Sequence, residues 1–456
     1  MKHKNIYSFV IMLLAVEIGL LIGGGNLRSY DVWWHLQQGL DTISNASVRL
    51  HDIYSHTNPG GFRPPQQWLF EVVQAGFYQL AEERGMIGLR MLLAVANMGL
   101  LALLLLRRKS SYLLMAAVIP LVASASMPTI TCRPHLLLPM FLLATIAIAR
   151  ASRRDPWAQW LLPPLFLLWV NMHASFLVGL AFVGIWAAQK SFLADPENPW
   201  EFCFDKSGLL QAAGVTAAVL AACCINPIGP RMLIYPLQYL PGGPLAWHAG
   251  VIQEWQSPDL GSLGRSSLAI ILFAGSAITI VEWRRATPFE ISVVLLMLVM
   301  GLRWQRSDMQ SAVVIAYIAI PLASAPLRQL SPSLLGWSPD SETAPHRLVP
   351  VMLAVIFFVG LLGISRVAGA KRVIHENIYP VQLATWANDH DLEGNMYNPM
   401  RWGGYMIHRL YPKYRVFIDG RMDMYPRELC EDYLTINHAE AGWEEIAQKH
   451  GVEWGF

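Results

Sequence analysis

The sequence predicts an α-helical polytopic membrane protein of about eleven transmembrane helices, followed by a small C-terminal α/β domain. Of the 456 residues, 54% are hydrophobic and only 14% are charged, whereas soluble globular domains carry about 25% charged residues. The charge is also uneven, because 22 of the 66 Asp, Glu, Lys and Arg residues fall in 371–456. This composition excludes an ordinary cytosolic enzyme and a disordered protein. The formal net charge of +2 gives no reason to expect a nucleic acid as a partner.

A helix of about 20 apolar residues crosses a bilayer, and this length identifies the predicted spans. The first span could be a secretory signal peptide, but it lacks a small-x-small cleavage site and precedes a polytopic chain, so a retained signal anchor is expected. The stretch 66–82 is short and contains Glu71 and Gln74, which favours an interfacial or partly embedded helix. The predicted spans are 6–24, 86–106, 111–128, 135–150, 157–170, 174–189, 208–225, 266–282, 288–302, 309–323 and 348–365.

Lys and Arg residues in the loops predict the orientation, because short basic loops stay on the cytoplasmic side. The basic N-terminus and alternate loops fall on one side of the predicted bundle, which is therefore expected to be cytoplasmic. Eleven spans then place the C-terminal domain on the outer side. The basic residues that carry this argument are Lys2, Lys4, Arg107, Arg108, Lys109, Arg150, Arg153, Arg154, Lys190, Lys206, Arg284, Arg285, Arg328 and Arg347.

Two domains are expected: a transmembrane domain at 1–370, whose first outer loop is 25–85, and a soluble domain at 371–456. Asp419 and Arg421 follow a predicted strand, where open α/β sheets contact ligands, although a salt-bridged turn would also explain them. The last predicted strand has only begun at Phe456, so the domain is expected to be cut short. Its predicted helices are about 378–389, 403–410, 426–435 and 440–449, and its predicted strands are near 394–397, 415–421 and 451–454.

The polar residues near the membrane gather, under this orientation, on the outer side. Ionisable residues in or near a membrane are costly and are usually functional, so this asymmetry indicates an active or binding face. Asp31 and Asp52 are the candidate catalytic carboxylates, and Asp31 is also a candidate metal ligand. The candidate substrate-binding residues are Trp34, His35, His56, Arg133, Asn171, His173, Glu254, Arg303, Arg306, Asp419 and Arg421.

Each candidate also has a structural explanation when it is taken alone. Asp31 could cap a helix at 32–43, and Trp33 and Trp34 could anchor an aromatic belt. Arg303 and Arg306 could extend to lipid headgroups. Single histidines are more often satisfied structural residues than functional ones, and Asn171 with His173 could tie a tight turn. Their common placement on one face is what favours function.

Carboxylates beside arginines suit glycosyl transfer from a lipid phosphate. Arginine binds phosphate bidentately, and a carboxylate can take a proton from the acceptor or hold a divalent metal such as Mg or Mn. The sequence has no P-loop and no Gly-x-Gly-x-x-Gly, so no nucleotide partner is expected. Its five cysteines show neither metal-binding spacing nor an even disulfide framework. The expected partners are a lipid-linked sugar donor and membrane lipids.

Motifs along nearly the whole chain resemble a group of bacterial polytopic membrane proteins, which in turn resembles the type-C (GT-C) glycosyltransferase superfamily. The motifs are Asp31-x-Trp33-Trp34-His35-Leu36, Asp52-x-x-Ser55-x-Thr57, Gln67-Trp68-Leu69, Arg133-Pro134, Trp169-Val170-Asn171-Met172-His173, Asn226-Pro227-x-Gly229, Glu254-Trp255-x-Ser257, Trp402-Gly403-Gly404 and Ile418-Asp419-Gly420-Arg421. Members of the superfamily carry an acidic residue in the first outer loop and use polyprenyl-phosphate sugars, and Asp31 matches that position. Here Val-Trp-Trp follows Asp31 rather than a second acid.

The resemblance implies a GT-C-like fold in the bacterial inner membrane, with a periplasmic C-terminal domain and a role in cell-envelope polysaccharide biosynthesis. The implied activity is transfer of a hexosyl or pentosyl group from a polyprenyl-phosphate donor. In this scheme Asp31 is the base or metal ligand, and Asp52 is the second candidate for that role. Arg303 and Arg306 hold the donor phosphate. Two alternatives remain open: a non-enzymatic transporter or flippase for lipid-linked glycans, and a scaffold for polysaccharide assembly. Polar residues on one face only favour the enzyme over a transporter.

Overall fold

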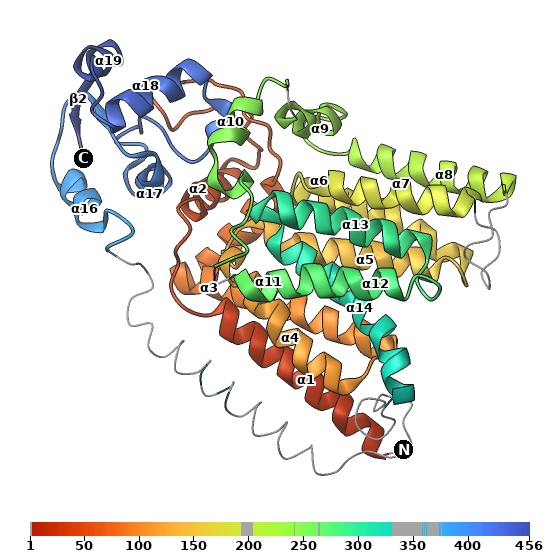
Figure 1. The fold of residues 1–456 in the computed structure, drawn as a ribbon. Coiled ribbons are helices and arrows are strands. Elements are labelled where there is room, and N and C mark those ends of the chain that lie inside the picture. The colour runs from red at the N-terminus through yellow and green to blue at the C-terminus, as the bar shows by residue number, and fades with distance from the viewer. Residues whose placement is uncertain are drawn as a thin grey trace.

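The computed structural model is a helical bundle that carries a smaller group of helices and strands at one end (Figure 1). It describes residues 2–192, 204–240, 242–262, 265–330 and 376–456, with residues 358, 360, 362 and 374. The predicted span 348–365 and the expected domain boundary near 370 lie outside the described ranges.

Helices α1 to α8 form the first half of the chain, with short 3-10 turns between them, and all but the amphipathic α2 follow apolar segments. Their bounds are α1 Lys2–Gly23, α2 Val32–Asn45, α3 Trp68–Arg107, α4 Tyr112–Ser126, η1 Met127–Thr129, η2 Pro134–Leu137, α5 Leu138–Ala151, η3 Pro156–Leu161, α6 Leu162–Met172, α7 Phe176–Phe192 and α8 Lys206–Cys223.

The second half continues the bundle as far as α14 and then forms the C-terminal group. The bounds are α9 Arg231–Ile234, η4 Tyr235–Tyr239, α10 Ala246–Val251, η5 Gln253–Trp255, α11 Ser266–Ile270, η7 Ile271–Gly275 (a π-helical turn), α12 Ser276–Val281, α13 Pro288–Arg303, η8 Gln305–Ser307, α14 Asp308–Leu330, α16 Val381–Asp389, β1 Asn395–Tyr397, α17 Met400–Leu410, η9 Met422–Met424, α18 Arg427–Asn437, α19 Trp443–Lys449 and β2 Val452–Gly455.

Six helical segments within the described ranges are long and apolar enough to cross a membrane, as expected of a multi-pass membrane protein. Two shorter apolar helices, at 176–192 and 266–281, accompany them. The count of eleven spans remains a prediction. The six segments are Ile6–Gly23, Trp68–Arg107, Tyr112–Thr129, Pro134–Ala151, Lys206–Cys223 and Gln305–Leu327.

Helix α3 contains a break that separates the ambiguous stretch 66–82 from the predicted span 86–106. Ala81 and Glu82 leave helical geometry, and Glu82 has a φ of 51°. Positive φ is unfavourable for a residue with a side chain, so Glu82 is a strained point where the helix direction changes. The segment before the break lies against α2 and carries Glu71 and Gln74, both buried.

Helix α14 lies at the centre of the bundle, in contact with α3, α4, α5, α12 and α13. At one end of the bundle, the buried Glu290 of α13 pairs with Arg108, 3.1 Å away, and with Arg150. Arg108 and Arg150 belong to two of the predicted cytoplasmic loops. The structure therefore places these two basic loops at the same end of the bundle. Arg133, just before α5, and Arg303 and Arg306, between α13 and α14, lie at the opposite ends of these helices.

The C-terminal group contains the four predicted helices, as α16 to α19, and a two-stranded parallel sheet of β1 and β2. The strand predicted at 415–421 is wrong, because only Val416 makes a bridge there, to Ser55. The backbone of this buried segment bonds instead to loops: Val416 N donates to Tyr54 O at 2.9 Å, and Phe417 N donates to Asn398 Oδ1 at 2.8 Å. The segment is therefore fixed between the first long loop and the C-terminal group.

Helix α2 joins the bundle to the C-terminal group, because it packs on α3 on one side and on α17 on another. Trp33 is fully buried and its ring contacts Tyr379, Tyr405 and His408. Trp34 is also buried. The aromatic-belt alternative is therefore wrong for both tryptophans, since a belt residue lies at the lipid–water interface.

Candidate functional site

Asp31 lies immediately before α2, but its carboxylate does not cap the helix. It makes no capping hydrogen bond, and its backbone is in the helical region. Its Oδ1 accepts a hydrogen bond from Trp34 Nε1 at 3.2 Å, and its Oδ2 lies 3.0 Å from Arg133 Nη2. The capping explanation for Asp31 is therefore not supported, and the carboxylate is held by side chains instead.

Arg133 links two carboxylates that are far apart in the sequence. Its Nη2 pairs with Asp31, and its Nη1 lies 2.6 Å from Glu254 Oε1. Burial alone would lower the pKa of the Arg133 guanidinium, but Asp31 and Glu254 outweigh it and raise that pKa. The cation therefore stays charged between its two partners.

Glu254 lies on the short turn η5 and stays ionised. Partial burial raises the pKa of its carboxyl, but the positive charges of Arg133 and Arg306 overcome this and lower the pKa to about 2. The next residue, Trp255, stacks on Tyr239 with a ring separation of 5.5 Å and lies 5.8 Å from the Arg306 guanidinium carbon. Loop 226–262 thus contributes both a carboxylate and an aromatic surface.

His173 and Arg306 form a group with more hydrogen-bond donors than acceptors. The backbone N–H of Ser175 points at His173 Nδ1 at 3.2 Å, and Arg306 Nη2 lies 3.4 Å from His173 Nε2. A neutral imidazole has a single acceptor nitrogen, so these two donors cannot both be satisfied by it. Burial, followed by the charge of Arg306, lowers the pKa of His173 well below its ordinary value, so the ring is neutral. One of the two donors is therefore left to another acceptor, such as water or a ligand oxygen.

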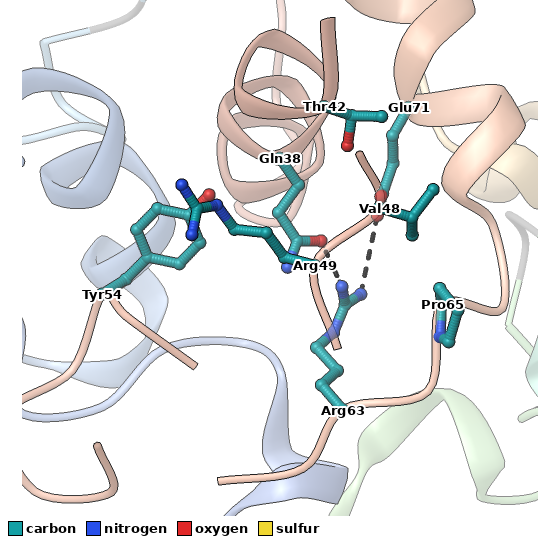
Figure 2. Close-up of a pocket in the computed structure, with 8 residues that line it drawn as sticks. All are labelled: Gln38, Thr42, Val48, Arg49, Tyr54, Arg63, Pro65 and Glu71. Atoms are coloured by element: carbon teal, nitrogen blue, oxygen red, sulfur yellow. Dashed lines mark hydrogen bonds and ion pairs between the residues drawn. The ribbon is translucent and has the colours of Figure 1, made fainter. Parts of the chain in front are cut away.

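His35 lies on the buried side of the cluster. Its Nδ1 is 3.0 Å from Glu71 Oε1, and Glu71 also pairs with Arg63 at 3.6 Å. Burial lowers the pKa of His35 well below its ordinary value, and the charges of Arg133 and Arg306 contribute. Figure 2 shows Arg63 and Glu71 in a small pocket beside α2, where Arg63 also reaches Gln38. The polar groups of this pocket pair with one another. Glu71 holds His35, and the Arg63 guanidinium lies over the Trp34 ring.

Asn171 and His56 have contacts that fix the architecture around the cluster. Asn171 accepts from Trp68 Nε1 at 2.8 Å and donates to the carbonyls of Leu167 and Ile225. His56 lies 3.0 Å from the carbonyl of Met396 in the C-terminal group. The Arg303 side chain is exposed at the end of α13. The structure places Arg306, but not Arg303, in contact with His173.

Asp52, Asp419 and Arg421 form a second, separate network that is almost completely buried. Arg421 pairs with Asp52 at 2.7 Å and with Asp419 at 2.6 Å, and Tyr425 donates to Asp419 at 2.7 Å. Asp52 also accepts from the backbone of Tyr54 and from Ser55. The network ties the first long loop to the C-terminal group, and its carboxylates are engaged by internal partners.

Gly420 connects the two networks, because it lies against Asp31. A Cβ at this position would come within 2.2 Å of Asp31 Oδ1 and 3.1 Å of Trp34 Nε1. We therefore expect Gly420→Ala to displace the Asp31 carboxylate and to lower activity at least tenfold with little change in melting temperature. Parallel measurements of thermal unfolding and of the activity proposed below test this, with Gly250→Ala, which meets no atom within 4 Å, as the control. Full activity of Gly420→Ala would show that Asp31 does not need this position.

Sequence reasoning missed several residues that hold the site. Glu71 and Arg63 could not be recognised from the sequence, because only the folded structure brings them to His35. Asp423 accepts from Tyr235 at 2.7 Å and from Gln66 at 3.2 Å, and it thereby joins three loops. Trp255 could have been predicted as a site residue, because it directly follows the candidate Glu254 in the Glu254-Trp255-x-Ser257 motif.

Comparison of the structure with known ones defines the class of fold, which is similar to that of archaeal oligosaccharyltransferases. No family model and no curated protein sequence matches the chain. An oligosaccharyltransferase of Archaeoglobus fulgidus, tethered to an acceptor peptide containing the NVT sequon, aligns with a TM-score of 0.59 at 12% identity, over 98% of this chain and 68% of its own. The archaeal oligosaccharyltransferase AglB from the same organism, in complex with an inhibitory peptide and a dolichol-phosphate, aligns with a TM-score of 0.62 at 11% identity, over 99% and 69%.

A third neighbour, the Archaeoglobus fulgidus enzyme in complex with Zn and sulfate, has a TM-score of 0.57 at 10% identity, over 98% of this chain and 67% of its own. In this chain, the residues at the cluster do not fit a divalent ion. Arg133 already takes one oxygen of Asp31 and one of Glu254. Within the described ranges, no three His, Cys, Asp or Glu side chains are grouped as a metal site would require.

Proposed function

We propose that this protein is an integral membrane glycosyltransferase that transfers a sugar from a polyprenyl-phosphate donor to an acceptor. The observation that carries the proposal is the surplus of donors at His173 and Arg306, beside the cluster of Asp31, Arg133 and Glu254. A phosphate oxygen of the donor would satisfy that surplus. The fold of oligosaccharyltransferases, one of which is described with a bound dolichol-phosphate, supports the same assignment.

In the proposed reaction, Asp31 acts as the general base. The acceptor O–H or N–H gives its proton to the Asp31 carboxylate, and the acceptor atom forms a bond to the anomeric carbon. The bond from that carbon to the phosphate oxygen breaks, and the electron pair leaves with the lipid phosphate. Arg306 and His173 stabilise the charge that develops on the phosphate, in the manner of preorganised donors, while Trp34 orients Asp31.

Arg306→Lys is expected to raise the KM for the lipid-linked donor by about 10- to 100-fold, with a smaller effect on kcat. Lysine keeps the charge but lacks the planar fork, and a hydrogen bond to a charged group contributes about 1.5–3 kcal/mol. Steady-state kinetics in proteoliposomes test this, with Arg303→Lys as the comparison. Because the Arg303 side chain is exposed, its substitution is expected to have the smaller effect. The reverse order would assign phosphate binding to Arg303.

The proposed location is the bacterial inner membrane, with the cluster and the C-terminal domain (371–456) on the periplasmic side. Reporter fusions after Lys109, Arg154 and Arg285 are then expected to report the cytoplasm, and a fusion after Gly394 the outer side. This topology is supported by the alternation of basic loops along the chain and by the position of Arg108 and Arg150 at the same end of the bundle. A cytoplasmic signal after Gly394 would refute this topology.

Membrane vesicles that contain the purified protein and a panel of radiolabelled polyprenyl-phosphate sugars test the function. The acceptor panel contains peptides and envelope polysaccharides. We expect radiolabel to move from the lipid to one acceptor class in vesicles with the parent protein and not with Asp31→Asn. Failure of every donor with every acceptor would reject the proposal.

A further inference from the structure

We propose that the guanidinium of Arg133 is a built-in cation that replaces a divalent metal ion between Asp31 and Glu254. The inference rests on the same site as the proposed function and deepens it, because it states what holds the carboxylates during sugar transfer. Sugar transfer would then proceed without a resident ion at this cluster.

The geometry of Arg133 supports this substitution. Its two terminal nitrogens lie 3.0 Å from Asp31 Oδ2 and 2.6 Å from Glu254 Oε1. A divalent ion binds carboxylate oxygens at about 2.0–2.6 Å, so an ion that used these two oxygens would have to displace the guanidinium from both. The second oxygen of Asp31 already accepts from Trp34.

The charges of the cluster are already balanced. Asp31 and Glu254 contribute two negative charges, and Arg133 and Arg306 contribute two positive charges. The pKa values of His35 and His173 are lowered by burial and by these arginines, so both rings are neutral. In the protein without its donor, a divalent ion would add two uncompensated positive charges to a partly buried group, which is unfavourable where the effective dielectric constant is low.

The segment that carries Arg133 is held in place. Arg133 has extended backbone geometry directly before Pro134, a position that proline restricts. The flanking backbone is fixed by His135 Nε2, 2.6 Å from the carbonyl of Thr129, and by Asn97 Nδ2, which donates to Leu136 O at 2.8 Å. Only 14% of the Arg133 side chain is exposed, so moving it aside would leave a largely buried guanidinium without its partners.

Manganese titration of the detergent-solubilised full chain, followed by the electron paramagnetic resonance signal of free Mn²⁺, tests the proposal without any turnover. The parent protein, purified with chelator, is expected to leave the Mn²⁺ signal unchanged. Arg133→Ala frees the two carboxylates and is expected to bind Mn²⁺ at least tenfold more tightly than the parent. Adding Asp31→Asn and Glu254→Gln to Arg133→Ala should abolish that gain. Arg28→Ala, an exposed arginine, is the matched control and should bind no ion.

Two results would overturn the proposal: Mn²⁺ binding by the parent protein that Asp31→Asn abolishes, or a folded Arg133→Ala variant that gains no affinity. Thermal unfolding shows whether Arg133→Ala is folded. If Arg133→Ala is unfolded, the titration of the parent protein decides alone. Absence of Mn²⁺ binding by the parent supports the proposal, and binding that depends on Asp31 refutes it. A failure of sugar transfer rejects the proposed function but leaves the Mn²⁺ result intact, so the two failures are distinguishable.

Discussion

Asp31→Asn is expected to lower the rate of sugar transfer by about 10²–10⁴-fold, the range typical of general acid–base catalysis, with unchanged expression and melting temperature. Asparagine keeps the shape of the side chain but cannot take the acceptor's proton. The folded structure should tolerate the change, because Arg133 keeps its contact with Glu254 and because Asp31 does not cap α2. Single-turnover kinetics and thermal unfolding of the same preparation provide the two measurements.

Asp259→Asn is the matched control, since Asp259 is an exposed carboxylate on the loop that also carries Glu254. Its variant is expected to turn over at the parent's rate. If Asp31→Asn also does so, Asp31 is not the base, and the catalytic assignment must be abandoned, because the other candidate, Asp52, is buried and engaged by Arg421, Tyr54 and Ser55.

Arg421→Met is expected to give the largest loss of stability, about 3–5 kcal/mol in the free energy of unfolding, as is typical when one partner of a buried ion pair is removed. The substitution leaves Asp52 and Asp419 as two buried carboxylates without their cation. Because this network joins the first long loop to the C-terminal group, we expect the group to become sensitive to protease as well. Thermal unfolding and limited proteolysis in detergent measure both effects.

Arg427→Met supplies the comparison, because Arg427 is exposed and pairs with Glu431 one helical turn away. Exposed pairs of this kind contribute little, so its melting temperature should match the parent's. A melting temperature for Arg421→Met equal to that of Arg427→Met would contradict the structural role of the buried network.

Much of the bundle could be predicted from the sequence, because apolar length and basic loops follow from local composition. The segments 111–128 and 135–150 correspond closely to α4 and α5. The helices of the C-terminal group and the strands near 394–397 and 451–454 were also predictable from their periodicity. The segment 415–421 was not, because its apolar run resembles a buried strand, while its partners are loops far away in the sequence.

The site was less predictable, because its partnerships depend on long-range packing. Asp31 and Asp52 look alike in the sequence, yet one contacts Arg133 beside a surplus of donors and the other is enclosed by Arg421, Tyr54 and Ser55. No local pattern distinguishes these environments. The roles of the candidate residues stay predictions, and the contrast between Asp31→Asn and Arg421→Met is the way to separate them.

The most direct test of the central claim is to follow both products of the reaction in sealed proteoliposomes that carry a doubly labelled polyprenyl-phosphate sugar, with one label on the lipid and one on the sugar. A transferase is expected to release free lipid phosphate in equal amount to the sugar that appears on the acceptor, and Asp31→Asn should abolish both. If the intact donor instead crosses the membrane with its sugar–phosphate bond unbroken, the protein is a lipid-linked glycan transporter and the glycosyltransferase account is wrong.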